Sequence, residues 1–406
     1  MNKLPEEVFN QVKDFVIFKP KTKNELQEVI NFYCENREEC IKKYGVINNW
    51  DVSNITDMSY LFSNSHTRNF NDPINDWNTS NVTNMKFMFR GSLFFNQPLN
   101  NWDTSNVTDM SFIFNDAFKF NQPLNNWNTS NVTNMKFMFN CAHNFNQPLN
   151  NWDTSSVTDM SNMFSLAFKF DQPLNNWNTS KVINMNSMFN CANSFNQSLN
   201  NWDTSKVINM SSMFHSTTNF NESLNNWDTS SVIDMSEMFG YTQKFNKPLN
   251  DWDISKVRNM YAMFIGAESF NQPLDNWNTS NVTNMTMMFH SAEKFNQSLD
   301  NWDISSLTDI EGMFSFTEKF NQPLNNWNTS NIKNMKYTFE SAIQFNQPLN
   351  NWDTSNVTDM TMMFYSAIRF NQSLNDWNIS HIEYTDCMFE KAKKFDIKLN
   401  AKWFNE

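Results

Sequence analysis

The side chains that most often carry out catalysis or bind metals are few in this chain and irregularly placed. The cysteines and histidines, five of each, show neither a Cys-x-x-Cys pair nor the spacing of a disulfide framework or a ligand pair. The five glycines are too dispersed to build a phosphate-binding loop. No nucleophile lies in a recognisable arrangement with a base. The sequence therefore predicts a protein that is not an enzyme and that holds no cofactor and no metal ion. The residues in question are Cys34, Cys40, Cys141, Cys191, Cys387, His66, His143, His215, His290 and His381.

Tryptophan marks a repeat of 25 residues that runs through most of the chain. From Trp77 to Trp377, consecutive tryptophans are 25 residues apart, and Trp50 and Trp403 lie 27 and 26 residues outside them. With Trp as position 1, all fourteen units have Ser at position 4 and Phe at positions 13 and 19. A fixed period of this length indicates a repeat architecture. We therefore divide the chain into residues 1–47 and a repeat region at 48–403.

Each unit is expected to contain one extended segment and one short helix. In one unit, the apolar residues of 110–117 follow the i, i+3, i+4, i+7 spacing of a helix of about two turns. Segment 123–129 contains Pro, Trp and Thr, which favour extended structure. Since one unit is too small to enclose a core, the sequence predicts an α/β solenoid of about fourteen strand-plus-short-helix rungs, each contacting its neighbours. The predicted core of this unit comprises Trp102, Val107, Met110, Ile113, Phe114, Ala117, Phe120 and Leu124.

Asp and Asn nearly alternate at two positions of the repeat. Position 2 runs from Asp51 to Asn378, and position 8 from Asp57 to Asp359. Neighbouring rungs would lie about 5 Å apart, where two carboxylates repel by roughly 3 kcal/mol at an effective dielectric constant of 20. Asn lowers this repulsion and keeps a side chain that satisfies loop backbone. We interpret both columns as structural ladders. Metal binding and duplication of a 50-residue pair are further explanations, although no glycine-rich calcium motif accompanies the aspartates.

Residues 1–47 lie outside the repeat and predict helices. The apolar residues of 4–16 share one helical face, and Thr22-Lys-Asn-Glu25 is a capping box that would open a second helix ending near Gly45. One interpretation is an α-helical N-terminal cap that shields the first rung. The other is that residues 4–16, LPEEVFNQVKDFV, resemble the start of an F-box, a motif that recruits a ubiquitin-ligase scaffold.

The string FNQPLNNWDTSNVTDMS, followed by MF, resembles the repeats of the BspA-like, leucine-rich-repeat-like surface-protein family. Such proteins are abundant as bacterial and mycoplasma surface lipoproteins and also occur in giant DNA viruses. The resemblance implies a leucine-rich-repeat-like solenoid used for binding or adhesion. Because the chain lacks the signal peptide and lipobox cysteine of the bacterial members, we expect an intracellular protein, for example a virus-encoded product in a host cytoplasm, rather than one displayed on a surface.

Large aromatic side chains at outward positions of the repeat are candidate partner-binding residues. If positions 9, 12, 13 and 16 face inward, positions 10, 11, 14 and 15 face solvent, and aromatics stacked over successive rungs there could anchor a partner. Filling of the space between neighbouring helices is the alternative. Positions 5 and 7, which vary between Asn, Ser, Thr, Lys and Ile, form a second candidate surface. The aromatic residues are Phe87, Phe112, Phe137, Tyr241, Tyr261, Phe316, Tyr337 and Tyr365, and the first three form the best single patch.

Charge and hydropathy exclude two classes of partner. The formal net charge of −12 argues against binding to nucleic acid. No stretch approaches the roughly 18 apolar residues that a membrane-spanning helix needs. We therefore predict a monomeric, non-enzymatic scaffold for protein–protein interaction, whose protein partner the sequence does not identify. An F-box-like ubiquitin-ligase substrate adaptor and a cell-surface adhesin are the alternatives.

Overall fold

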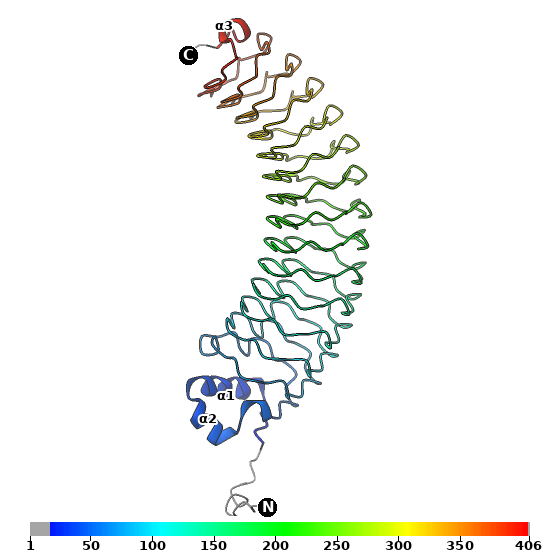
Figure 1. Cartoon of the computed structure of the whole chain (residues 1–406), viewed down its shortest axis with the longest axis vertical. Coiled ribbons are helices and arrows are strands. Elements are labelled where there is room, and N and C mark those ends of the chain that lie inside the picture. Colours follow the sequence, from blue (N-terminus) through cyan, green and yellow to red (C-terminus); the bar gives the residue numbers. More distant parts are fainter. Residues whose placement is uncertain (1–16, 405–406) are drawn as a thin grey trace, which may run out of the picture.

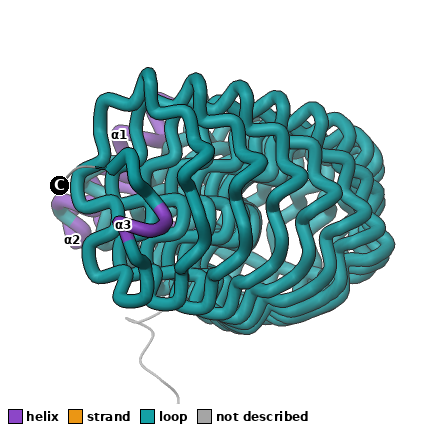
Figure 2. The backbone as a smooth tube through the Cα atoms, turned by 90° about the horizontal axis from the view of Figure 1, so that it is seen from above, coloured by secondary structure: helices purple, strands orange, loops and turns teal. Residues whose placement is uncertain are grey.

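The computed structural model describes residues 17–404, in which the chain winds into a curved stack of coils (Figure 1). Each coil is one repeat unit, which we call a rung and number by its tryptophan. Helices lie only at the two ends of the stack, and the rungs between them are drawn as loop (Figure 2). The helical elements of the described residues are α1 (Lys23–Glu35), α2 (Arg37–Tyr44), the 3-10 helix η2 (Ile47–Asn49) and α3 (Ile397–Asn400).

The predicted α/β rung of one strand and one short helix is wrong. Between residues 50 and 396, the described chain contains neither a helix nor a named strand. Residues 111–116, where the apolar spacing predicted a helix, form a series of turns, and segment 123–129 is irregular with one turn. The regular feature that joins the rungs is a set of isolated parallel bridges at position 8, such as that between Asn84 and Asp109.

The backbone amides of positions 9 to 15 explain why no helix forms. Amides at odd positions donate to a carbonyl of the next rung, as from Phe112 N to Lys136 O at 3.0 Å. Amides at positions 12, 14 and 16 close short turns within the rung, as from Ile113 N to Met110 O at 3.3 Å. In an α-helix, each of these amides would donate to the carbonyl four residues earlier. Hydrogen bonds between rungs, which we call the backbone ladder, therefore replace the bonds of the predicted helix.

This ladder requires left-handed backbone at two positions of nearly every rung. In rung 102 these residues are Phe112 and Asp116, both with φ of 59°. Side chains other than glycine cost about 1–2 kcal/mol in this conformation. The same conformation recurs from Tyr60 to Lys391 mostly without glycine, so the bonds between rungs must offset that cost repeatedly.

The predicted core is confirmed, since all eight residues named for rung 102 are buried. Two polar groups of the core also join the rungs. The indole Nε1 of Trp127 donates to Leu99 O at 3.0 Å, and Thr104 Oγ1 donates to Asn128 O at 2.9 Å. Both kinds of bond recur along the stack, so the interior is cross-linked by hydrogen bonds as well as by apolar packing.

The spacing of equivalent rings explains the curvature of the stack. The parallel rings of Trp102 and Trp127 have centroids 6.4 Å apart, whereas those of Phe87 and Phe112, beside the backbone ladder, are 4.3 Å apart. Rungs that are closer on one side than on the other must bend toward the closer side. We infer that the backbone ladder lies on the inner side of the arc in Figure 1.

The Asp and Asn columns act as the structural ladders that the sequence predicted. A side-chain oxygen at position 2 or 8 accepts a bond from the amide two residues later, as from Ser105 N to Asp103 and from Ser111 N to Asp109, both 2.9 Å. A third column, at position 20, was not predicted. There each side chain accepts the amide of the same position in the next rung, without a break from Asn71 to Asp396.

The N-terminal helices differ from the prediction in one respect. Thr22 caps α1 by accepting the amide of Glu25, as predicted, but the helix ends at Glu35 and a second helix follows. Asn36 causes the break because it is the C-cap of α1 and, through its side chain, the N-cap of α2. The helix predicted within residues 4–16, and with it the F-box-like segment, lies outside the described residues.

Glycine substitution distinguishes the turns of a rung from the predicted helix. Ser212 has φ of 53°, whereas its neighbour Ser211 is not among the residues with positive φ and donates its hydroxyl to Asn209. We expect Ser212→Gly to leave the free energy of unfolding unchanged or to raise it by up to about 1 kcal/mol, because relief of left-handed strain offsets the lost backbone restriction.

Ser211→Gly is the matched control and should lower stability by about 1 kcal/mol. Urea unfolding of both variants measures the difference. Equal destabilisation by the two substitutions, as expected inside a helix, would contradict the observed backbone.

Candidate functional site

The three aromatic residues predicted to form the best patch lie in one continuous stack of rings. Phe87, Phe112 and Phe137 are half-buried, and their centroids are 4.3 and 4.6 Å apart with nearly parallel planes. Tyr60 extends the row at 4.7 Å from Phe87 and is 44% exposed. We call these four residues the aromatic stack. The sequence contained the signal for Tyr60, since it occupies position 11 of the first rung.

The other five predicted aromatics do not join the aromatic stack or one another. Tyr241 and Phe316 are exposed and pack edge-on against the ring of a histidine in the preceding rung. The ring of Tyr241 also lies over Gly266, where a Cβ atom would be 2.5 Å from it. Tyr337 and Tyr365 each lie below a lysine ammonium, and Tyr261 is half-buried. These residues are therefore separate surface features.

A second row of rings was missed by the sequence analysis. Phe118, His143 and Phe168 occupy position 17 of successive rungs and stack with centroids 4.4 and 4.6 Å apart. Their regular spacing of 25 residues was the available signal. A surface hollow of about 460 Å³ is lined among others by Arg68, Arg90, Asp116 and Phe118. The Arg90 guanidinium is 5.7 Å from the centre of the Phe87 ring.

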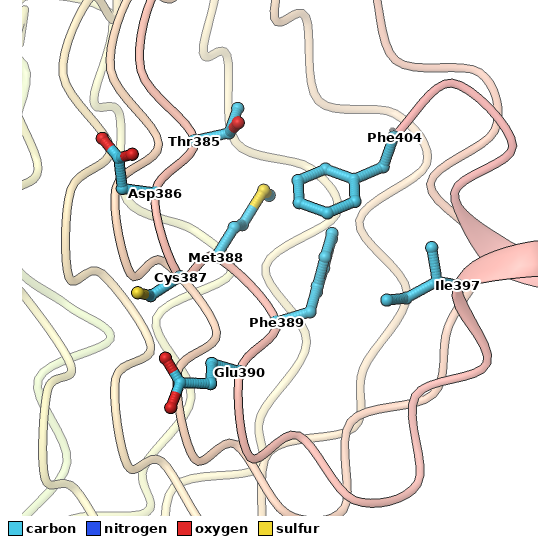
Figure 3. A pocket seen from close by; sticks show the side chains of 8 residues that line it. All are labelled: Thr385, Asp386, Cys387, Met388, Phe389, Glu390, Ile397 and Phe404. Carbon is cyan, nitrogen blue, oxygen red and sulfur yellow. The ribbon is translucent and has the colours of Figure 1, made fainter. Parts of the chain in front are cut away.

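A second hollow, of about 400 Å³, lies at the C-terminal end of the stack (Figure 3). Met388, Phe389 and Phe404 form its apolar side, and the carboxylates of Asp386 and Glu390 point away from that side. The amides of Cys387 and Phe389 stand at positions whose amides donate to the next rung elsewhere in the stack, but the described residues hold no following rung to accept them. This end of the stack therefore presents backbone donors beside an apolar hollow.

Burial shifts the pKa of several titratable side chains in the described chain. Burial raises the pKa of the Cys141 thiol to about 12 and of Cys34 and Cys40 to about 11, which keeps these thiols protonated near neutral pH. Burial also lowers the pKa of His215 and His290. Among residues 17–404, no group of three or more potential ligands could hold a metal ion.

Comparison with known proteins assigns the repeat. The chain matches the family described as "Mycoplasma protein of unknown function, DUF285" over residues 35–147, 122–224, 192–302 and 290–403. The chain belongs to this family. Because the matches overlap from 35 to 403, DUF285 repeats account for the whole stack of rungs. The resemblance to mycoplasma repeat proteins is thus confirmed, whereas the narrower BspA-like assignment stays a prediction.

No curated protein and no solved structure matches the chain. As a DUF285 member, the protein is a repeat protein from a family of unknown function. None of the helices described for residues 17–404 has both the length and the apolar character that crossing a bilayer requires.

The aspartates at position 2 are expected to make the stability of the stack depend on pH. Hydrogen bonds from the serine two residues later hold the pKa of six of them below its ordinary value of 3.8. Since the folded pKa is lowered, this stabilisation is fully present above pH 3.8 and is lost as the pH falls through the folded values. The six are Asp103, Asp153, Asp203, Asp253, Asp303 and Asp353.

Replacing these six aspartates by asparagine should flatten the loss of stability below pH 4. Stability at pH 7 should change little, because Asn128 already occupies the same position and accepts the amide of Ser130 at 3.1 Å. Thermal unfolding of both proteins between pH 2 and 7 measures this dependence. Identical pH profiles would show that the column does not contribute.

Proposed function

We propose that this DUF285 protein is a non-enzymatic repeat scaffold that mediates protein–protein interaction. The observation that supports this function most directly is the aromatic stack, in which four rings lie on successive rungs and remain partly exposed. Aromatic side chains are enriched among the residues that contribute most to binding energy at protein interfaces. The rungs already hold the rings in place, so these side chains would lose little conformational entropy when a partner binds.

The surroundings of the aromatic stack favour a polypeptide over a small ligand. The hollow beside it is open, and Arg68 and Arg90 could bind carboxylates or backbone carbonyls at its rim. Small-molecule sites are usually enclosed and mostly apolar. An open hollow with two arginines in its lining, one of them over the Phe87 ring, fits a segment of another protein better.

Residues 1–47 would serve this scaffold as its N-terminal cap, and residues 48–403 would form its repeat region. Two contacts of α1 with the first rung support this division. The side chain of Gln27 donates to Leu61 O at 2.9 Å, and Lys23 pairs with Asp57 at 3.0 Å. Leu61 O is at the ladder position that a preceding rung would otherwise engage. Without such a cover, the end of a repeat stack exposes its core and its backbone.

The remaining parts of the proposal extend the predictions from the sequence. The scaffold would act as a monomer inside the cell, without catalysis and without binding nucleic acid, which suits its net charge of −12. No observation on residues 17–404 favours the F-box-like adaptor or the surface adhesin over this function.

Substitution of the aromatic stack tests the function. Position 11 holds serine in rungs 177 and 202, so Phe87→Ser, Phe112→Ser and Phe137→Ser should be accommodated by the backbone together. We expect the triple variant to lose its partners about tenfold or more in affinity capture from lysate of the cells that express the protein, quantified by mass spectrometry.

A matched control replaces position 11 elsewhere, by Met287→Ser and Met362→Ser, and should keep those partners. Thermal unfolding midpoints verify that both proteins fold. Capture of the same proteins by both variants at wild-type levels would contradict binding through the aromatic stack.

A further inference from the structure

Two outward columns of the repeat change together over four neighbouring rungs. Elsewhere position 7 is mostly Thr and position 5 mostly Asn. From rung 177 to rung 252, position 7 becomes Ile three times and then Arg, and position 5 becomes Lys in three of the four rungs. We call these residues the Ile–Lys face. They are Ile183, Ile208, Ile233, Arg258, Lys181, Lys206 and Lys256.

The residues that usually occupy these positions help to join the rungs. Asn at position 5 donates to the preceding rung, as from Asn106 Nδ2 to Ser80 O at 2.7 Å. Thr at position 7 does the same through its hydroxyl, as from Thr133 Oγ1 to Thr108 O at 3.3 Å. Within the described residues, no side chain of the Ile–Lys face makes such a bond to the preceding rung. The fold therefore does not explain the replacement.

The isoleucines form an apolar row on the surface. Ile183 and Ile208 are each 44% exposed and Ile233 is 47% exposed. Their backbones are adjacent, since Ile208 N donates to Ile183 O and Ile233 N to Ile208 O, both at 2.9 Å. Three exposed isoleucines on adjacent rungs form a contiguous patch of the kind that marks interaction sites.

Positively charged side chains are concentrated beside this row, although the protein as a whole is acidic. Positions 5 and 7 carry five Lys or Arg residues in the repeat region, and four of them belong to the Ile–Lys face. In the described chain, none of the four forms an ion pair with a carboxylate, although Arg258 binds Asn281. The nearby carboxylates of Asp203 and Asp253 already accept bonds from serine amides. The cations are thus available to a partner.

We propose that the Ile–Lys face binds the apolar stripe of an acidic amphipathic α-helix of a partner protein. Adjacent backbones at bridge spacing lie about 4.8 Å apart, so three isoleucines span about 10 Å. Two turns of an α-helix cover about 11 Å, which brings its apolar residues at i, i+4 and i+7 over the row. Carboxylates beside that stripe meet the lysines. This binding rests on the interaction function proposed above but uses residues away from the aromatic stack.

A designed peptide tests this binding directly. The probe is a fluorescent helix of about 18 residues, or five turns, with a leucine stripe flanked by glutamate, and its counterpart carries lysine in place of glutamate. We expect fluorescence anisotropy to show binding of the acidic peptide only, weakened by salt.

Two variants restore the residues common in other rungs and should therefore fold. Ile183→Thr, Ile208→Thr and Ile233→Thr together restore the Thr column, and Lys181→Asn, Lys206→Asn and Lys256→Asn together restore the Asn column. Each triple variant should weaken peptide binding about tenfold or more. The Ser variant of the aromatic stack is the control and should bind the peptide as the wild type does.

The outcomes separate this proposal from the interaction function as a whole. Equal binding by wild type and both restored variants, or no binding of the acidic peptide to the wild type, would overturn it. Binding to phosphatidylserine vesicles with no binding to the peptide would overturn it in favour of a membrane surface. In each of these cases, partners captured through the aromatic stack would leave the interaction function standing.

Discussion

Every other feature of this structure depends on the hydrogen bonds that run from odd-numbered positions of one rung to the next. The amides at positions 9, 11, 13 and 15 donate to the following rung. The carbonyls at positions 8, 10, 12 and 14 accept from the preceding rung. One rung alone cannot satisfy these groups, and unpaired buried backbone is costly. Stacking is therefore required for the conformation of each rung, including its left-handed residues such as Phe112.

The same constraint determines which positions are free to vary. The buried columns and the Asn, Asp and Thr ladders are tied to the backbone, so their residue types repeat along the chain. At the outward positions 5 and 7 the bonds that Asn and Thr make to the backbone are omitted in some rungs, and positions 11 and 17 hold varied residue types. The aromatic stack, the Phe118 row and the Ile–Lys face all lie there, which is why the candidate binding surfaces are local departures from the repeat.

The period, the core and the turn-forming Asp and Asn columns could be predicted from sequence because they depend on residue type and spacing. The rung backbone could not, since alternating turns bury Met110, Ile113 and Phe114 as well as a helix does. Left-handed conformation at Phe112 carries no sequence signal, because glycine is its usual mark. The break at Asn36 was missed because Asn can cap either end of a helix. The column at position 20, which is Asn except at Asp171 and Asp396, was missed because a repeated Asn does not reveal its partner.

The central claim is that the amides of a rung bind the next rung and not their own. The most direct measurement is NMR detection of scalar couplings across hydrogen bonds in the deuterated full-length protein. The account predicts a coupling from the Phe112 amide to the carbonyl of Lys136, with equivalent pairs along the stack. A coupling from Phe112 to the carbonyl of Thr108, four residues earlier, would instead show a helix and would contradict the account.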